Sequence, residues 1–122
     1  MCVAADRIAP TPAALADDAA AALPVAAGTA VQALADDAKL ERGMRVLVIG
    51  AAGGVGHFAV QFAKHAGAHV TATCGPGNLD FVASLGADVV VDYTRADATR
   101  DASPFDVVFD VAGRSSWRAV RN

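Results

Sequence analysis

The sequence predicts an α/β fold, a Rossmann-type doubly wound parallel sheet that is incomplete, with about four strands. Residues 45–50 form a short, continuously apolar run that ends at glycine, which is typical of a strand buried on both faces of a parallel sheet. A glycine-rich loop follows this run and opens a helix with one apolar face. Strand-like and helix-like segments then alternate as far as Val111, as a sheet with helical crossovers requires.

Each element has its own local signal. Residues 1–12 contain two prolines and are expected to be an extended lead-in, and Gly43 is expected to offer a left-handed stop after the second helix. Asn78 is expected to cap the helix that Gly86 ends. The expected helices are 13–23 (ending near Pro24), 26–38, 57–66 and 79–85, and the expected strands are 45–49, 68–73, 88–92 and 105–111.

Composition excludes several classes of protein. The chain has 122 residues, 54 % of them hydrophobic and 19 % charged, so it forms one domain or part of a larger one rather than a disordered chain. The net charge of −3 argues against a nucleic-acid partner, since only Arg114, Arg118 and Arg121 cluster. Cys2 and Cys74 stand far apart with no CxxC, so neither a zinc ribbon nor a disulfide framework is expected, and the compartment is expected to be reducing.

No targeting or membrane segment is expected. The amino terminus lacks a long apolar stretch after a basic start, so it does not fit a signal peptide. The most apolar run, residues 19–35, consists mostly of alanine and contains Pro24 and Gly28, so a membrane span is not expected. The sequence therefore predicts a cytoplasmic location.

The glycine loop carries the chemical prediction. Gly50, Gly53 and Gly56 stand three residues apart between the first strand and the helix. Unpaired N–H groups at the start of a helix bind a pyrophosphate when no side chain blocks its approach. Residues 53–55 are therefore predicted to lie closest to phosphate, and Gly56 to be the close contact between helix and strand. A turn in a chain rich in alanine and glycine is the structural alternative.

The end of the second strand predicts which dinucleotide binds. NAD sites commonly place Asp or Glu there to bind the ribose hydroxyl. This strand ends at Thr73 and Cys74, and no acid follows before Asp80, so NADP is favoured. No Lys or Arg follows closely either, which leaves main-chain N–H groups, Thr73, Tyr93 and Arg95 to bind the 2′-phosphate. A Cys74→Asp substitution is expected to shift the preference toward NAD.

Six segments together resemble the medium-chain dehydrogenase/reductase superfamily, and within it the zinc-independent NADPH:quinone oxidoreductase branch. They are residues 21–34, 43–56, 59–64, 84–88, 91–93 and 106–113, in the order that the family has. The resemblance covers nearly the whole chain. It implies hydride transfer from NADPH to a quinone, enone or related carbonyl, with the cofactor supplying the chemistry.

The resemblance also implies site residues and missing parts. Cofactor-binding roles carry over to eleven positions, and no catalytic residue carries over. Val25 stands where zinc-dependent relatives have a cysteine ligand, so no zinc is expected. Residues 1–12 resemble the trailing edge of a GroES-like substrate domain and residues 13–122 part of the cofactor domain, so the chain is expected to be a fragment, inactive alone, of a homodimeric parent. The cofactor positions are Thr29, Ala52, Gly53, Gly54, Val55, Thr73, Cys74, Tyr93, Val111, Ala112 and Gly113.

Two other interpretations stay open at this stage. Gly50, Gly54 and Gly56 also fit the short-chain dehydrogenase pattern, although that family needs a Tyr-x-x-x-Lys pair and Asp97 follows Tyr93 at that spacing. The third interpretation is a non-catalytic NADP-binding remnant, which would bind NADPH without oxidising it. The three histidines have no metal-ligand spacing on one helix face, so no metal site is expected.

Overall fold

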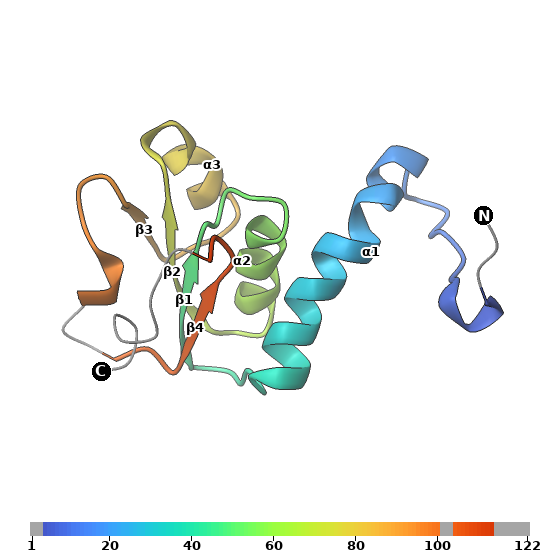
Figure 1. Cartoon of the computed structure of the whole chain (residues 1–122), viewed down its shortest axis with the longest axis horizontal. Helices are drawn as coiled ribbons and strands as arrows, with labels where there is room; N and C mark the ends of the chain where they lie inside the picture. Colours follow the sequence, from blue (N-terminus) through green and yellow to red (C-terminus); the bar gives the residue numbers. More distant parts are fainter. Residues whose placement is uncertain (1–3, 101–103, 114–122) are drawn as a thin grey trace.

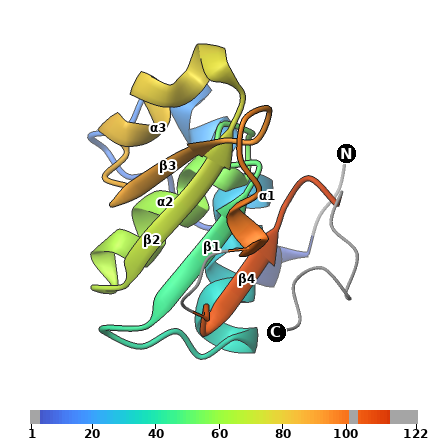
Figure 2. The same cartoon turned by 90° about the vertical axis from the view of Figure 1, so that its left-hand side faces the viewer.

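A computed structural model describes residues 4–100 and 104–113 of the chain. Four parallel strands form one sheet in the order β3-β2-β1-β4, and Figure 2 shows the sheet face-on with the helices behind it. They are β1 (Arg45–Ile49), β2 (His69–Cys74), β3 (Val89–Asp92) and β4 (Val107–Asp110). The predicted parallel α/β sheet is confirmed. Cys2 and the three arginines near the carboxyl end lie outside the described residues.

The register brings the carboxyl ends of the strands to one edge. Ile49 at the end of β1 pairs with Thr73 of β2 and with Asp110 of β4, and Cys74 pairs with Asp92 of β3. The loops that follow all four strands therefore start side by side. In parallel α/β sheets this edge is where ligands bind.

Helices cover one face of the sheet. The helices α2 (Gly56–His65) and α3 (Leu79–Ser84) lie against it, and α1 (Asp17–Val31) contacts α2 from outside (Figure 1). Short 3-10 turns precede α1 (Ala5–Arg7) and α3 (Pro76–Asn78). The core between these layers consists of small and branched side chains: Ala30, Leu34, Val46, Val48, Ala51, Ala59, Val60, Ala63, Ala68, Val70, Ala72, Cys74 and Val82.

The predicted break near Pro24 is wrong, because α1 runs through Pro24 and continues as a π-helical segment, η2 (Gln32–Asp37). A proline inside a helix costs about 3 kcal/mol. The alanine-rich flanks favour helix strongly, and Ala30 and Leu34 are fully buried in the core. Those contributions outweigh the lost hydrogen bond. Gly43 was expected to provide the left-handed residue that ends the helix. The first residue with a positive φ after η2 is instead Lys39 (φ 51°), and Gly43 (φ 86°) follows four residues later.

The connection from β3 to β4 crosses the opposite face of the sheet (Figure 2, orange). Its described part contains one 3-10 turn, η4 (Ala98–Arg100), and two aspartate-braced turns. Asp92 accepts hydrogen bonds from the N–H (2.9 Å) and hydroxyl (2.8 Å) of Thr94, and these bonds lower its pKa. Asp97 accepts the same pair from Thr99. These turns fix the path of the segment over the carboxyl edge.

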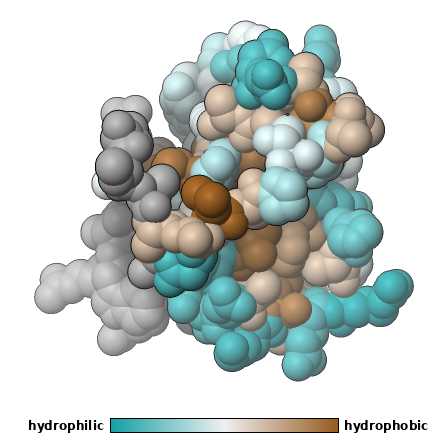
Figure 3. Space-filling view, turned by 90° about the vertical axis from the view of Figure 1, so that its right-hand side faces the viewer, coloured by the Kyte–Doolittle hydropathy of each residue, from teal (hydrophilic) through white to brown (hydrophobic). Residues whose placement is uncertain are grey.

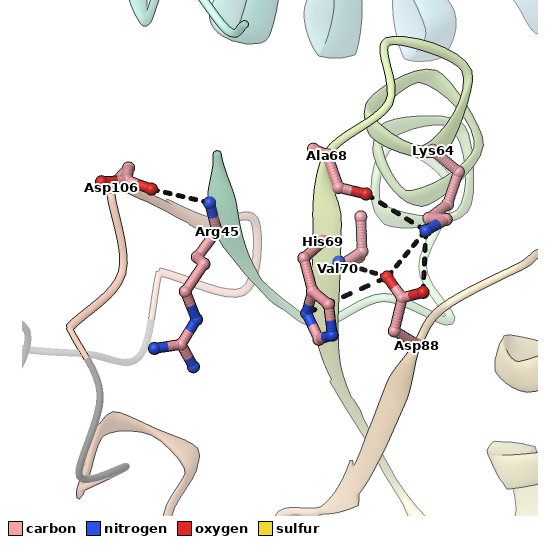
Figure 4. Close-up of polar contacts among 7 residues, drawn as sticks. All are labelled: Arg45, Lys64, Ala68, His69, Val70, Asp88 and Asp106. Atoms are coloured by element: carbon pink, nitrogen blue, oxygen red, sulfur yellow. Dashed lines mark hydrogen bonds and ion pairs between the residues drawn. The ribbon is translucent and has the colours of Figure 1, made fainter. Parts of the chain in front are cut away.

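Two aspartates fasten the opposite, amino edge (Figure 4). The Asp88 carboxylate accepts hydrogen bonds from Lys64 Nζ (2.7 and 2.8 Å) and from the N–H of Val70 (2.7 Å), and the Asp88 N–H donates to the Val70 carbonyl. Asp106 makes the same double contact with the main chain of Arg45. Each aspartate thus sets the register of the strand that it precedes.

The face formed by α1 carries exposed apolar side chains. Figure 3 shows apolar residues gathered in the middle of this face, with hydrophilic residues around them. Val25 is 79 % exposed, and Ile8 and Val31 are also exposed. The segment Asp17–Asp37 has the length and hydropathy of a helix that could cross a membrane, a test that core helices of other proteins also pass. The expectation of no membrane span therefore stays a prediction.

Candidate functional site

The turn between β1 and α2 depends on two glycines. Gly50 adopts φ +85°, a left-handed conformation that glycine accepts without strain. A Cβ on Gly56 would lie 2.2 Å from the Gly50 carbonyl oxygen and 2.8 Å from the Ala51 Cα, so no other residue fits there. Gly56 is therefore the close contact between helix and strand that the sequence predicted.

Several main-chain N–H groups of this loop have no acceptor within the described residues. The N–H of Gly53 donates to the Gly50 carbonyl (3.1 Å), and that of His57 donates to the Gly53 carbonyl (3.1 Å). By contrast, the N–H groups of Ala52, Gly54 and Val55 make no hydrogen bond there. No side chain caps α2 either. The start of this helix therefore presents free donors and partial positive charge.

These donors border a hollow of about 530 Å³, which we call the loop hollow. The ends of β1, β2 and β4 form its floor, and α1 contributes Ala26. A Cβ on Gly54 would meet no atom within 4 Å, so the space over that residue is open. The loop hollow is lined by Ala26, Gly50, Ala52, Gly53, Gly54, Val55, Cys74, Gly75, Asn78, Tyr93, Val111 and Ala112.

A second hollow of about 560 Å³ adjoins it, beneath the segment that crosses from β3 to β4, and we call it the crossover hollow. The two share Gly50, Tyr93 and Ala112. The remaining lining is apolar apart from two threonines and one carboxylate. It consists of Ile49, Thr73, Ala96, Asp97, Ala98 and Thr99.

Thr73 and Cys74 point to opposite sides of the sheet. The Thr73 hydroxyl accepts a long hydrogen bond (3.4 Å) from the Gly50 N–H, and Thr73 lines the crossover hollow. Cys74 is 2 % exposed and its side chain belongs to the core. Burial, reinforced by the charge of Asp92, raises the pKa of the Cys74 thiol. Cys74→Asp would thus place a carboxylate among core side chains, and the expected shift of that variant toward NAD stays a prediction.

Tyr93 lies between the two hollows. Its N–H donates to the Cys74 carbonyl (3.2 Å), which continues the ladder beyond β3. Its hydroxyl oxygen is 3.1 Å from the point where a Cβ on Gly75 would stand, so the ring lies over Gly75. Tyr93 remains 58 % exposed. Arg95, the cation considered for the phosphate, lies 3.6 Å from Asp92 and lines neither hollow among the described residues.

Thr29 and Gly113 stand apart from the other predicted site residues. The Thr29 hydroxyl donates to the Val25 carbonyl one turn earlier in α1 (2.7 Å), and among the described residues it is Ala26, not Thr29, that lines the loop hollow. Gly113 (φ +62°) donates its N–H to the Asp110 carboxylate (2.9 Å). Val111 and Ala112 do line the loop hollow.

Sequence reasoning missed two polar residues of these hollows. Asn78 was expected to cap α3, but its side chain makes no capping hydrogen bond, and it lines the loop hollow. Asp97 entered the sequence argument only as the residue that stands where the short-chain dehydrogenase pattern needs a lysine. In the structure it lines the crossover hollow. An Asp-x-Thr pattern, present at both Asp92 and Asp97, was the available signal for the braced turns. Within residues 4–100 and 104–113, no three His, Cys, Asp or Glu side chains come together as a metal site.

The parallel sheet, with its glycine loop at the carboxyl edge, defines a Rossmann-type α/β domain. A family model described as zinc-binding dehydrogenase matches residues 54–121, more than half of the chain. The chain therefore belongs to that family of the medium-chain dehydrogenase/reductase superfamily, which implies a nicotinamide cofactor. The short-chain alternative is thereby overturned.

The relatives are oxidoreductases, and the chain spans less than a third of their length. It is 52 % identical over 96 residues to the chloroplast envelope quinone oxidoreductase homolog of Arabidopsis thaliana. The matched region covers 75 % of this chain and 29 % of that protein. It is 38 % identical over 118 residues to NAD(P)H oxidoreductase RTN4IP1, mitochondrial, of Danio rerio, and this match covers 91 % of this chain and 30 % of that protein. The structure of the quinone oxidoreductase from Coxiella burnetii matches with TM-score 0.76 and 39 % identity. The match covers 81 % of this chain and 31 % of that one.

The names of two relatives bear on location. One is called a chloroplast envelope protein and the other mitochondrial, so relatives of this chain are not confined to the cytoplasm. The cytoplasmic location expected from the sequence stays a prediction.

Proposed function

We propose that this chain is the NADPH-binding part of an oxidoreductase that transfers hydride to a quinone, an enone or a related carbonyl compound. One observation carries the proposal: the free N–H groups of Ala52, Gly54 and Val55 border an open hollow at the carboxyl edge of the sheet. This is the arrangement that binds the pyrophosphate of a dinucleotide. The names of the relatives support the choice of substrate class.

The residues present fit the cofactor. Gly53 and Gly54 leave room for a phosphate over the start of α2, where a Cβ on Gly54 would project into open space. The N–H groups of the loop would bind the pyrophosphate oxygens, while Val111 and Ala112 would border the cofactor at the end of β4. The nicotinamide ring supplies the hydride, and the chain's own residues bind and orient the cofactor. Thr29 is proposed to lie near the nicotinamide, as the family resemblance implies.

NADP is proposed over NAD because no carboxylate follows β2 directly. Gly75 succeeds Cys74, and the Tyr93 hydroxyl lies over Gly75. The adenosine ribose would lie here, against Thr73, Tyr93 and the main chain of Cys74. The Asn78 side chain adds a neutral donor to the same hollow. Gly77→Arg, at a position with nothing within 4 Å of its Cβ, would strengthen the preference.

The remaining proposals concern the parent protein. Residues 1–12 would be the trailing edge of a GroES-like substrate domain, residues 13–122 would belong to the cofactor domain, and the parent would be a homodimer. Catalysis would not need zinc, since Val25 stands in place of a cysteine ligand, even though the family is described as zinc-binding. A non-catalytic NADP-binding remnant is the alternative. It would bind NADPH but never oxidise it with a quinone.

Titration of the purified chain with NADPH, followed by cofactor fluorescence, tests the proposal. The wild-type chain should bind, and Gly54→Leu should weaken binding at least tenfold, because its side chain would enter the space over the loop, where a Cβ meets no atom within 4 Å. Gly28→Ala, an equally unhindered position in α1, is the matched control and should leave the affinity unchanged. No binding by the wild-type chain, or equal binding by Gly54→Leu, would contradict the proposal.

A further inference from the structure

The side chain of His57, the second residue of α2, contacts the glycine loop. Its ring Nδ1 lies 3.0 Å from the Gly53 carbonyl oxygen, which also accepts a hydrogen bond from the His57 main-chain N–H at 3.1 Å. A carbonyl oxygen can only accept, so Nδ1 carries a proton in this contact. One residue therefore occupies both lone pairs of this oxygen. The proposed pyrophosphate site uses main-chain donors of the loop and gives this side chain no part.

The Gly53 carbonyl decides where the Gly54 N–H points. Both groups belong to one planar trans peptide unit, so they point in opposite directions. The carbonyl points to His57 in the first turn of α2, and the Gly54 N–H therefore points away from that turn. This N–H has no acceptor within the described residues, and Gly54 lines the loop hollow. Holding the carbonyl thus keeps one donor of the loop available to a phosphate oxygen.

This peptide unit has little of its own to prevent it from turning over. It lies between two glycines, and turning it over changes ψ of Gly53 and φ of Gly54 together. Neither glycine has a positive φ in the structure, but Gly54 could adopt one without strain. The turned-over unit would present the Gly53 carbonyl oxygen, an acceptor, where the Gly54 N–H was, and it would repel a phosphate. A second hydrogen bond to this oxygen opposes that change.

Two aromatic neighbours hold the His57 ring in place. Its centroid lies 4.1 Å from that of Phe58 and 6.5 Å from that of Phe81, with the ring planes tilted by 39° and 42°. Tilted pairs of this kind attract each other. Phe81 belongs to α3, so the ring is held by a different element from the loop that it contacts. A ring that is already fixed loses little conformational entropy when it donates to the Gly53 carbonyl.

We propose that His57 is a positioning residue for the cofactor, and that its Nδ1–H fixes the Gly53–Gly54 peptide so that the Gly54 N–H points at the pyrophosphate. The inference rests on the proposed function, since the pyrophosphate belongs to the same cofactor. In this role His57 acts through the loop and does not itself contact phosphate. A chain with the turned-over peptide is not competent to bind, and the apparent affinity falls with the competent fraction.

Two substitutions at His57 separate the donor from the ring. His57→Asn keeps an N–H donor as many bonds from the main chain as Nδ1, whereas His57→Phe keeps a ring without a donor. In the NADPH titration, His57→Asn should bind within about twofold of the wild type and His57→Phe about fivefold more weakly, the effect of one net hydrogen bond. His65→Phe, the same change at an exposed position of α2 outside both hollows, should leave the affinity unchanged.

Equal binding by His57→Phe and the wild type, or an equal loss in His57→Asn and His57→Phe, would overturn the inference while leaving the proposed function intact. Failure of the wild-type chain to bind NADPH would instead overturn the proposed function, and the inference with it. Nitrogen NMR of the His57 ring needs no variant. In the neutral ring the proton should reside on Nδ1, and a proton on Nε2 would overturn the inference. This measurement decides alone if a thermal melt shows that either variant is unfolded.

Discussion

The glycines of the β1–α2 loop have different roles, and the space around each one shows what a side chain there would meet. Gly56 has no room for a Cβ, since the Gly50 carbonyl oxygen would lie 2.2 Å away. Gly54 faces open space, so its missing side chain benefits a ligand and not the fold. Their spacing in the sequence predicted Gly56 as the close contact between helix and strand, and the distances around it confirm that role. Substitution should therefore separate stability from binding.

Gly56→Ala should lower the free energy of unfolding by about 2 kcal/mol or more, because the new methyl group forces the helix away from the end of β1. Gly54→Ala should change it by less than about 0.5 kcal/mol, the usual range for a surface substitution. Urea unfolding followed by circular dichroism measures both. Equal stability of the two variants would show that the helix can shift without cost.

At the scale of elements, two aspartate side chains add contacts between neighbouring strands at the amino edge of the sheet, while the loops that line the hollows lie at the carboxyl edge. Asp88 ties β3 to β2 and, through Lys64, to α2, while Asp106 ties β4 to β1. Burial opposes ionisation of Asp88, but the hydrogen bonds from Lys64 and Val70 outweigh it, so its pKa is lowered. Fixing the amino edge holds the register, and register decides which residues meet at the carboxyl edge.

Asp88→Asn should lower the free energy of unfolding at pH 7 by about 1–2 kcal/mol, allowing for the partial exposure of the ion pair. Because the folded pKa of Asp88 is depressed, its stabilisation is present above the unfolded value near 3.9 and is lost as pH falls through the folded pKa. The difference between the variant and the wild type should therefore shrink as pH falls from about 5 toward 2. Asp80→Asn is the control, and a difference independent of pH would contradict the assignment.

At the scale of the whole molecule, the sheet collects loops from distant parts of the sequence at one edge. Gly50, Tyr93 and Ala112 follow β1, β3 and β4 and line both hollows, while Thr73 lies in β2 and lines the crossover hollow. A ligand that spans both hollows would contact every strand connection except those at the amino edge. It would therefore stabilise the folded chain as a unit.

Saturating NADPH should raise the melting temperature of the chain. A concentration one hundred times the Kd adds about 2.7 kcal/mol of stability, which corresponds to a shift on the order of 10 °C for a domain of this size. Differential scanning fluorimetry with increasing NADPH measures the shift, and Gly54→Leu should show a much smaller one at the same concentrations. A melting temperature that does not respond to NADPH would contradict binding to the native state.

The sequence by itself determined the parallel α/β sheet and the glycine loop, since buried apolar runs and glycine spacing are local signals that few other folds use. Tertiary structure decided the faces and the long-range neighbours. Cys74 lies in the core and Thr73 lines the crossover hollow. The sequence could not predict this division, because the residues of a strand buried on both sides are apolar on both faces. Burial of Ala30 and Leu34 in the core stabilises the continuation of α1 beyond Pro24. Asp97 lines the crossover hollow because the connection from β3 to β4 runs over the carboxyl edge. Strand order, and not local sequence, sets this path.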